Sequence, residues 1–114
     1  MKAVSNSLMN HTIEKRKYPR HPVTIQSVFS SGPIRGEEGT ILDLSYEGCR
    51  IFSSTVPTPE SMIEIQIKPR QGSPVFVPKA VVRWTGESAF GVEFKAVAGY
   101  ESSKLARLFS VSTA

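Results

Sequence analysis

Cysteine, histidine and aspartate are scarce in this chain, which narrows the chemistry that it can perform. Its 114 residues include one cysteine, Cys49, and two histidines, His11 and His21. A single cysteine excludes an internal disulfide, and so few soft ligands exclude a zinc site of the usual spacing. Asp43 is the one aspartate. We therefore expect no metal and no cofactor, and the sequence does not fit a disulfide-stabilised secreted scaffold.

A recognisable catalytic set is also missing. Cys49, the two histidines and the scattered serines form no nucleophile and base pair of known spacing. Glutamates that could share acid–base work, such as Glu64 and Glu93, have the pattern of solvent-facing strand residues. No glycine-rich phosphate loop of the Walker or dinucleotide type precedes a helix. The sequence predicts a protein that is not an enzyme and has no catalytic residues.

Long apolar runs are absent as well. No stretch approaches the ~18 apolar residues of a membrane span, and the residues before Lys15 contain no apolar core of a signal peptide. We expect a cytoplasmic protein without a membrane span.

Positive charge is present but confined to one end. Residues 1–20 carry five basic side chains and one acidic one, whereas the rest of the chain carries nine of each, so the net charge of +4 lies entirely at the N-terminal end. Four of the cations, Lys15, Arg16, Lys17 and Arg20, lie close together and would attract an anion such as a phosphate. Residues 1–14 have little core-forming content, and we expect them to form a flexible arm.

Short apolar runs separated by turn residues follow Pro22, which is typical of an all-β barrel or sandwich. In the clearest run, isoleucines alternate with polar residues from Met62 to Lys68, as in a half-buried strand. Pro78 predicts a bulge or an edge position in the fifth run. We expect a loop at Gly36–Gly39 and six strands, at Val23–Phe29, Thr40–Leu44, Gly48–Phe52, Met62–Lys68, Val75–Trp84 and Ala89–Phe94.

The period of the pattern changes near the C-terminus. Leu105, Leu108 and Phe109 fall on one face of a predicted helix over Tyr100–Phe109, which indicates a short amphipathic helix packed on the barrel, over one of its open ends. The expected organisation is an N-terminal arm at 1–14 and one domain at 15–110, with its helix at about 98–110.

Two polar groups of residues stand out as binding candidates. Arg16 and Arg20 are four residues apart on a segment that Pro19 keeps from being a regular helix, so their guanidinium groups can converge on one ligand. Asp43, Ser45 and Gly48 extend from the end of one predicted strand to the start of the next. The Asp43 carboxylate can accept hydrogen bonds from the neighbouring donors of a guanine edge, and Gly48 permits close backbone approach.

In this order the two groups match RxxxR followed by [D/N]xSxxG, and from Lys15 to Phe109 the chain resembles the PilZ domain family, bacterial receptors for cyclic di-GMP. The resemblance implies a six-stranded antiparallel β-barrel of the split-barrel type with a C-terminal helix, which agrees with the strands counted above. It also implies that Arg16 and Arg20 bind the phosphates and guanine faces of the ligand, while Asp43, Ser45 and Gly48 close around a base.

The same resemblance draws attention to further residues. In the family, the residue at the position of Lys15 influences whether one ligand or a stacked pair is bound, and Trp84 falls where some relatives supply a wall of the site. Lys17 and His21 are candidates by adjacency. Other interpretations stay open. Trp84 can pack in the core or at the barrel rim, and His21 can be an ordinary packing residue. Asp43 and Ser45 can be a pair that caps a turn.

The sequence thus predicts a non-catalytic cyclic di-GMP receptor whose N-terminal arm changes conformation on binding and which signals to an unidentified partner protein. One alternative is a PilZ-like adaptor that binds no nucleotide. Another is a small β-barrel that binds single-stranded nucleic acid. The neutral charge of residues 21–114, without a basic stripe interleaved with aromatics, argues against the nucleic-acid alternative.

Overall fold

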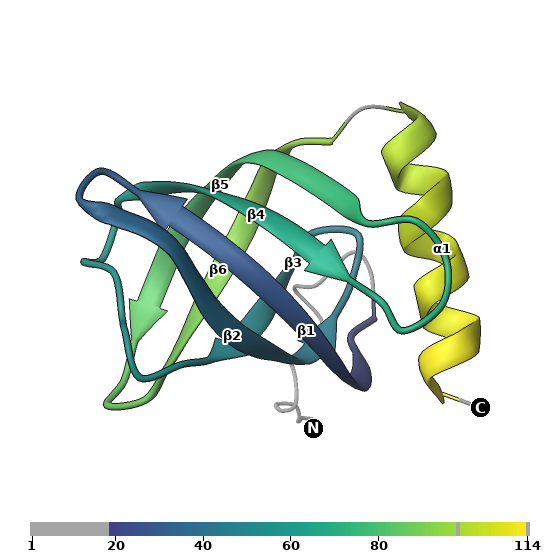
Figure 1. Ribbon diagram of the computed structural model, residues 1–114, viewed down its shortest axis with the longest axis horizontal. Coiled ribbons are helices and arrows are strands. Elements are labelled where there is room, and N and C mark those ends of the chain that lie inside the picture. The colour runs from purple at the N-terminus through teal and green to yellow at the C-terminus, as the bar shows by residue number, and fades with distance from the viewer. Residues whose placement is uncertain (1–18, 98, 114) are drawn as a thin grey trace, which may run out of the picture.

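The computed structural model describes residues 19–97 and 99–113 as a closed antiparallel barrel with one helix (Figure 1). The order of strands around the barrel is β1-β2-β3-β6-β5-β4, and β4 pairs with β1 to close it. This confirms the predicted all-β, six-stranded architecture. The elements are β1 (His21–Ser31), β2 (Ile34–Leu44), β3 (Gly48–Phe52), β4 (Met62–Lys68), β5 (Val75–Thr85), β6 (Ala89–Ala96) and α1 (Gly99–Thr113).

Strict alternation along the strands builds the core. In β4 the isoleucines 63, 65 and 67 are buried and the residues between them are exposed, as the period of two predicts. Phe29 and Phe90 meet edge to face at the centre, with ring centroids 5.1 Å apart. Helix α1 lies beside one end of the barrel against β1 and β5 (Figure 1), where Leu105 and Leu108 join the core. The predicted packing of the helix is confirmed.

The predicted loop at 36–39 is wrong, because β1 and β2 form one long hairpin. Its loop is Gly32–Pro33, with Gly32 at a φ of 54°. Gly36 has a φ of 59° and lies where the pairing register shifts by one residue, so it forms a bulge inside the strand. Gly39 is buried, and a Cβ there would lie 3.3 Å from the Phe29 ring. These two glycines serve the strand and do not end it.

Pro78 lies at a second irregularity. The β4–β5 register shifts between Ile63 and Ile65, where β5 has one residue more than β4 between Val77 and Ala80. A bulge leaves one residue unpaired, so a residue without an N–H group is tolerated there. The bulge alternative is confirmed, and in the closed barrel Pro78 is not on a sheet edge.

Several sequence predictions lie outside the described residues. These are the flexible arm at 1–14, the cations Lys15, Arg16 and Lys17, and the side chain of Phe109. Helix α1 continues to Thr113, beyond the predicted end at 110. Within the described part of the chain, no helix is long and apolar enough to cross a membrane.

Candidate ligand-binding site

Asp43 lies near the end of β2, on the outer face of the barrel, with a cation on each carboxylate oxygen. Its Oδ1 accepts a hydrogen bond of 2.9 Å from a terminal nitrogen of Arg20, and its Oδ2 lies 3.2 Å from Nε of Arg50. The Asp43 side chain is 19% exposed, so the pairs are partly shielded from water. The carboxylate is thereby held in one orientation and still faces solvent.

The strand pairing explains why Arg20 reaches this carboxylate. Pro22, the second residue of β1, is directly opposite Asp43 on β2. Arg20 immediately precedes β1, so its side chain begins close to the aspartate. The Arg20 side chain is 23% exposed, and its Nε is buried without a hydrogen-bond partner among the described atoms. The structure therefore brings together one residue of each motif, Arg20 and Asp43.

Arg50 is a member of the site that the sequence analysis missed. It is the residue of β3 directly opposite Asp43, although the register on this side depends on an extra residue in β2 between Ile41 and Asp43. Side chains directly opposite on one face of an antiparallel pair interact, and opposite charges stabilise the pair. The sequence shows a basic residue, Arg50, two positions after Gly48. Only the shifted register of the bulged strand places it opposite Asp43.

Ser45 has a different position from the one that the motif suggests. It lies just after β2, is 1% exposed, and its Oγ accepts hydrogen bonds from the backbone N–H groups of Glu47 (3.0 Å) and Gly48 (3.2 Å). The Ser45 N–H donates to the carbonyl oxygen of Gly48 at 2.9 Å. The hydroxyl thus closes the tight β2–β3 turn from inside, as serine does in short turns.

Gly48 is required by close packing of β3 against β6. A Cβ at this position would overlap the carbonyl oxygen of Val92, which is a backbone atom and cannot rotate away. The turn is fixed to β6 from its other side too, because the Phe94 N–H donates to the carbonyl oxygen of Glu47 at 2.7 Å. The turn beside Asp43 is therefore rigidly attached to the barrel wall.

Trp84 lies on the same outer face as the aspartate. Arg50 is opposite Gly91 on β6, and Gly91 is in turn opposite Trp84 on β5. The indole covers Gly91, since a Cβ there would overlap Nε1 of the ring, yet Trp84 is 44% exposed. Asp43, Arg50, Gly91 and Trp84 thus form a row across four strands, which we call the polar row. Trp84 packs on the barrel exterior and not in the core.

His21 and Cys49 border the polar row. His21 is the first residue of β1, half-buried and opposite Leu44. Cys49, next to Arg50, is fully buried in the core. Burial raises the pKa of its thiol far above the ordinary value, the negative charge of Asp43 raises it further, and Arg20 opposes this shift. The thiol is therefore protonated and unreactive at neutral pH.

A second group of charges lies beside the row on the outer surface. Arg83 donates from Nε to Glu93 Oε1 at 2.8 Å and from a terminal nitrogen to Glu60 Oε1 at 3.0 Å. The hydrogen bond with Glu93 raises the pKa of Arg83, and the same bond lowers the pKa of the Glu93 carboxyl. These groups are mutually paired. Among the described residues, no cluster of three or more histidine, cysteine, aspartate or glutamate side chains could hold a metal ion.

The structure is thus a small closed barrel that carries a partly shielded carboxylate between two guanidinium groups, with an exposed indole nearby. A sequence profile of the PilZ domain matches residues 14–110, and the chain belongs to this family of cyclic di-GMP receptors. PilZ domains are generally binding domains without catalytic activity.

Several solved structures share this fold, and two of them are PilZ-type proteins of known source. The PilZ domain of CeSA from a cellulose-synthesizing bacterium aligns with a TM-score of 0.65 and 17% identity, over 82% of this chain and 96% of that one. The Bacillus subtilis inhibitor of motility, MotI/DgrA, aligns with a TM-score of 0.69 and 13% identity, over 86% of this chain and 50% of that one. No curated protein sequence matches this chain.

Proposed function

We propose that this protein is a non-catalytic receptor that binds cyclic di-GMP at the polar row and passes the signal to a partner protein in the cytoplasm. The observation that carries the proposal is the meeting of Arg20 and Asp43, one residue from each PilZ motif, on one exposed face. Stabilisation of the fold does not by itself explain a second cation on this carboxylate, because the Arg50 side chain is 45% exposed and ion pairs of exposed side chains contribute little to stability.

The chemistry of the ligand fits these groups. Arg20 can pair bidentately with a phosphate or stack on a guanine, and Arg50 is placed to do the same from β3. The Asp43 carboxylate can accept from the two donors on a guanine edge, and the exposed Trp84 indole offers a stacking surface. Ser45 and Gly48 act by holding the β2–β3 turn in place beside the carboxylate.

The way in which ligand binding could be passed to a partner follows from the positions of the binding residues along the chain. Arg16 precedes β1, whereas Asp43 is the residue before the last one of β2. A ligand held at once by Arg16 and Asp43 joins the N-terminal segment to the barrel wall. In this proposal the rearranged N-terminal segment is the surface that the partner protein recognises. Cyclic di-GMP itself undergoes no reaction.

Isothermal titration calorimetry with cyclic di-GMP tests the proposal, with GTP and a short single-stranded DNA as parallel titrants. We expect saturable binding of the cyclic dinucleotide at ~1 μM, which corresponds to about −8 kcal/mol. Arg20→Ala should weaken it by at least about tenfold, because a charge-assisted hydrogen bond contributes about 1.5–3 kcal/mol. The fitted number of ligands per chain reports the role of Lys15.

Arg35→Ala is the matched control, since Arg35 is an exposed β2 arginine without an ion pair among the described residues. It should bind like the wild type. Absence of binding to all three titrants would reject the receptor in favour of an adaptor, and DNA binding alone would favour the nucleic-acid alternative.

A further inference from the structure

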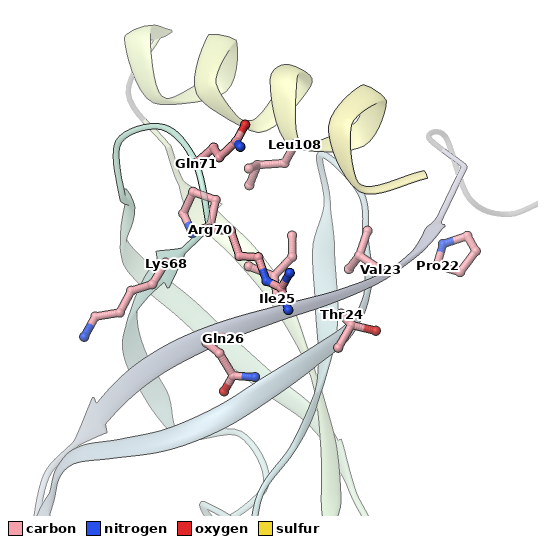
Figure 2. A pocket seen from close by; sticks show the side chains of 10 residues that line it. Pro22, Val23, Thr24, Ile25, Gln26, Lys68, Arg70, Gln71 and Leu108 are labelled. Atoms are coloured by element: carbon pink, nitrogen blue, oxygen red, sulfur yellow. The ribbon is translucent and has the colours of Figure 1, made fainter. Parts of the chain in front are cut away.

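A cleft of about 660 Å³ lies between the start of β1, the β4–β5 loop and helix α1 (Figure 2). Its size is within the range of specific binding pockets, ~300–1,000 Å³. Neither Asp43 nor Arg50 lines it. The cleft lies along the β4-facing edge of β1, whereas Asp43 pairs across the other edge. We call it the β1-edge cleft.

The backbone of β1 has no strand beside it at this cleft. Pairing with β2 begins at His21, but pairing with β4 begins only at Gln26, opposite Lys68. No backbone hydrogen bond among the described residues joins positions 22–25 to the β4–β5 loop at 69–74. An unpaired strand edge is a template on which another extended chain can form hydrogen bonds. In an otherwise closed barrel, this short edge is the place where a strand can be added.

The lining of the cleft is half apolar and half polar, with positive charge at its rim. Val23 and Ile25 form one wall, and Leu108 points toward them from α1 in Figure 2. Lys68, at the end of β4, and Arg70, in the β4–β5 loop, are exposed, and none of the ten lining residues is acidic. Neither cation has an ion pair or side-chain hydrogen bond within the described part of the chain, in contrast to the mutually paired charges around Arg83. The cleft therefore lacks its own counter-charge.

We propose that the β1-edge cleft binds an extended, acidic segment of a partner protein. The segment adds a short strand to β1 over positions 22–25 and places carboxylates against Lys68 and Arg70. Where its side chains point toward the barrel they meet the cleft floor, of which Val23, Ile25 and Leu108 expose only 7%, 5% and 5%. Main-chain hydrogen bonds to an edge provide affinity in this mode of recognition, and side-chain contacts provide specificity. The charge of the occupant follows from two cations that lack an internal acid.

Selection of random nine-residue peptides displayed on phage against the immobilised full-length protein tests the proposal. The protein with Lys68→Glu and Arg70→Glu serves for counter-selection. The protein with Arg35→Glu and Lys79→Glu is the matched control, because it carries the same charge change on exposed cations elsewhere. We expect peptides rich in glutamate or aspartate and in β-branched residues. They should bind the cleft variant at least about tenfold more weakly, and the control within about twofold of the wild type.

N-methylation of the best peptide separates strand addition from attraction by charge alone. Alternate backbone N–H groups of an added strand point to the same side. Methylating one alternate set should abolish binding, and methylating the other set should leave it unchanged. Equal effects of the two sets, selected peptides without acidic residues, or equal binding to the cleft variant would each overturn the proposal. None of the exchanged residues belongs to the polar row, so this outcome and that of the cyclic di-GMP titration are independent.

Discussion

Arg50 is the residue that the structure adds to the proposed binding site. It holds one oxygen of Asp43, and its own side chain is 45% exposed between the aspartate and the Trp84 indole. We expect Arg50→Ala to weaken cyclic di-GMP binding by about three- to tenfold, because Asp43 loses one of its two orienting cations and the ligand loses one guanidinium. The free energy of unfolding should change by less than about 1 kcal/mol, as for other exposed ion pairs.

Calorimetric titration and urea unfolding of the same preparation check both parts, with Arg35→Ala as the control. Unchanged affinity in Arg50→Ala would remove this residue from the site and leave Arg20 as the one cation on Asp43 among the described residues.

Gly48 illustrates a motif residue whose requirement is steric. An added Cβ meets the carbonyl oxygen of Val92, a backbone atom of β6, so relief requires movement of a strand. We expect Gly48→Ala to lower the free energy of unfolding by about 1–3 kcal/mol in urea titrations. At Gly86 the added Cβ would lie 3.6 Å from the Ala89 carbonyl oxygen, an ordinary contact. Gly86→Ala should therefore stay within about 0.5 kcal/mol of the wild type, and equal effects of the two changes would contradict the steric explanation.

Cys49 gives a pH dependence that belongs to one buried thiol. Its pKa is raised in the folded protein, mainly by burial, so only the unfolded chain loses this proton as the pH passes the ordinary thiol pKa of ~8.5. The contribution of the neutral thiol to stability is complete below that pH and is lost above it. Between pH 7.5 and 9.5 the wild type should lose about 1.4 kcal/mol more than Cys49→Ala does.

Urea unfolding of both proteins across this range measures the difference. A thiol reagent offers a second check at neutral pH, where the folded protein should react far more slowly than the protein in urea. Parallel pH profiles of wild type and Cys49→Ala would show that the thiol ionises in the folded state.

At the scale of elements, the helix depends on one buried carboxylate. Glu101, in the first turn of α1, is 7% exposed, and its Oε1 accepts from the Phe76 N–H at the start of β5 at 3.0 Å. Glu101→Ala leaves this N–H without that partner, which should lower the free energy of unfolding by about 1–3 kcal/mol and accelerate hydrogen exchange at Phe76. Glu101→Gln keeps an acceptor oxygen and should lose less. Glu87→Ala, an exposed glutamate in the β5–β6 turn, is the control; exchange at Phe76 that stays slow in Glu101→Ala would rule out this anchor.

The elements themselves could largely be predicted, because alternation decides which side of a strand faces the core. All six strands and the helix were expected, whereas the loop at 36–39 was not a loop. A segment of two glycines and two glutamates resembles a turn in sequence. In the structure Gly36 forms a bulge within β2, and Gly39 packs closely on Phe29. Local composition cannot show either, since both depend on the neighbouring strand.

The candidate site was predictable only as a set of residue types. The motifs named Arg20 and Asp43, and the hairpin register brings them within hydrogen-bond distance. Arg50 was missed because its pairing with Asp43 depends on a register shift in the bulged strand β2. Ser45 was expected to face the ligand, and its hydroxyl is instead engaged by the turn. The hydrogen-bond partners of a polar side chain depend on the folded structure and cannot be inferred from its place in a motif.

At the scale of the whole molecule, the apolar core and the excess charge lie in different parts of the chain. The core extends from Val23 to Leu108, while the net charge of +4 lies before residue 21. The PilZ match begins at residue 14. We expect a chain lacking residues 1–14 to keep both its melting temperature and its affinity for cyclic di-GMP. A chain lacking residues 1–18 should keep its melting temperature within about 2 °C but lose affinity, because it lacks Lys15, Arg16 and Lys17.

Thermal unfolding with and without cyclic di-GMP measures both quantities together, since a ligand that binds only the folded state stabilises it by about 2.7 kcal/mol at one hundred times its Kd. The wild type and the shorter deletion should show this shift, and the longer deletion should not. Arg20→Ala in the full-length chain is the matched control, because it removes a cation without shortening the chain. A ligand-induced shift that survives deletion of residues 1–18 would place recognition on the barrel alone, and the N-terminal segment could then not carry the signal.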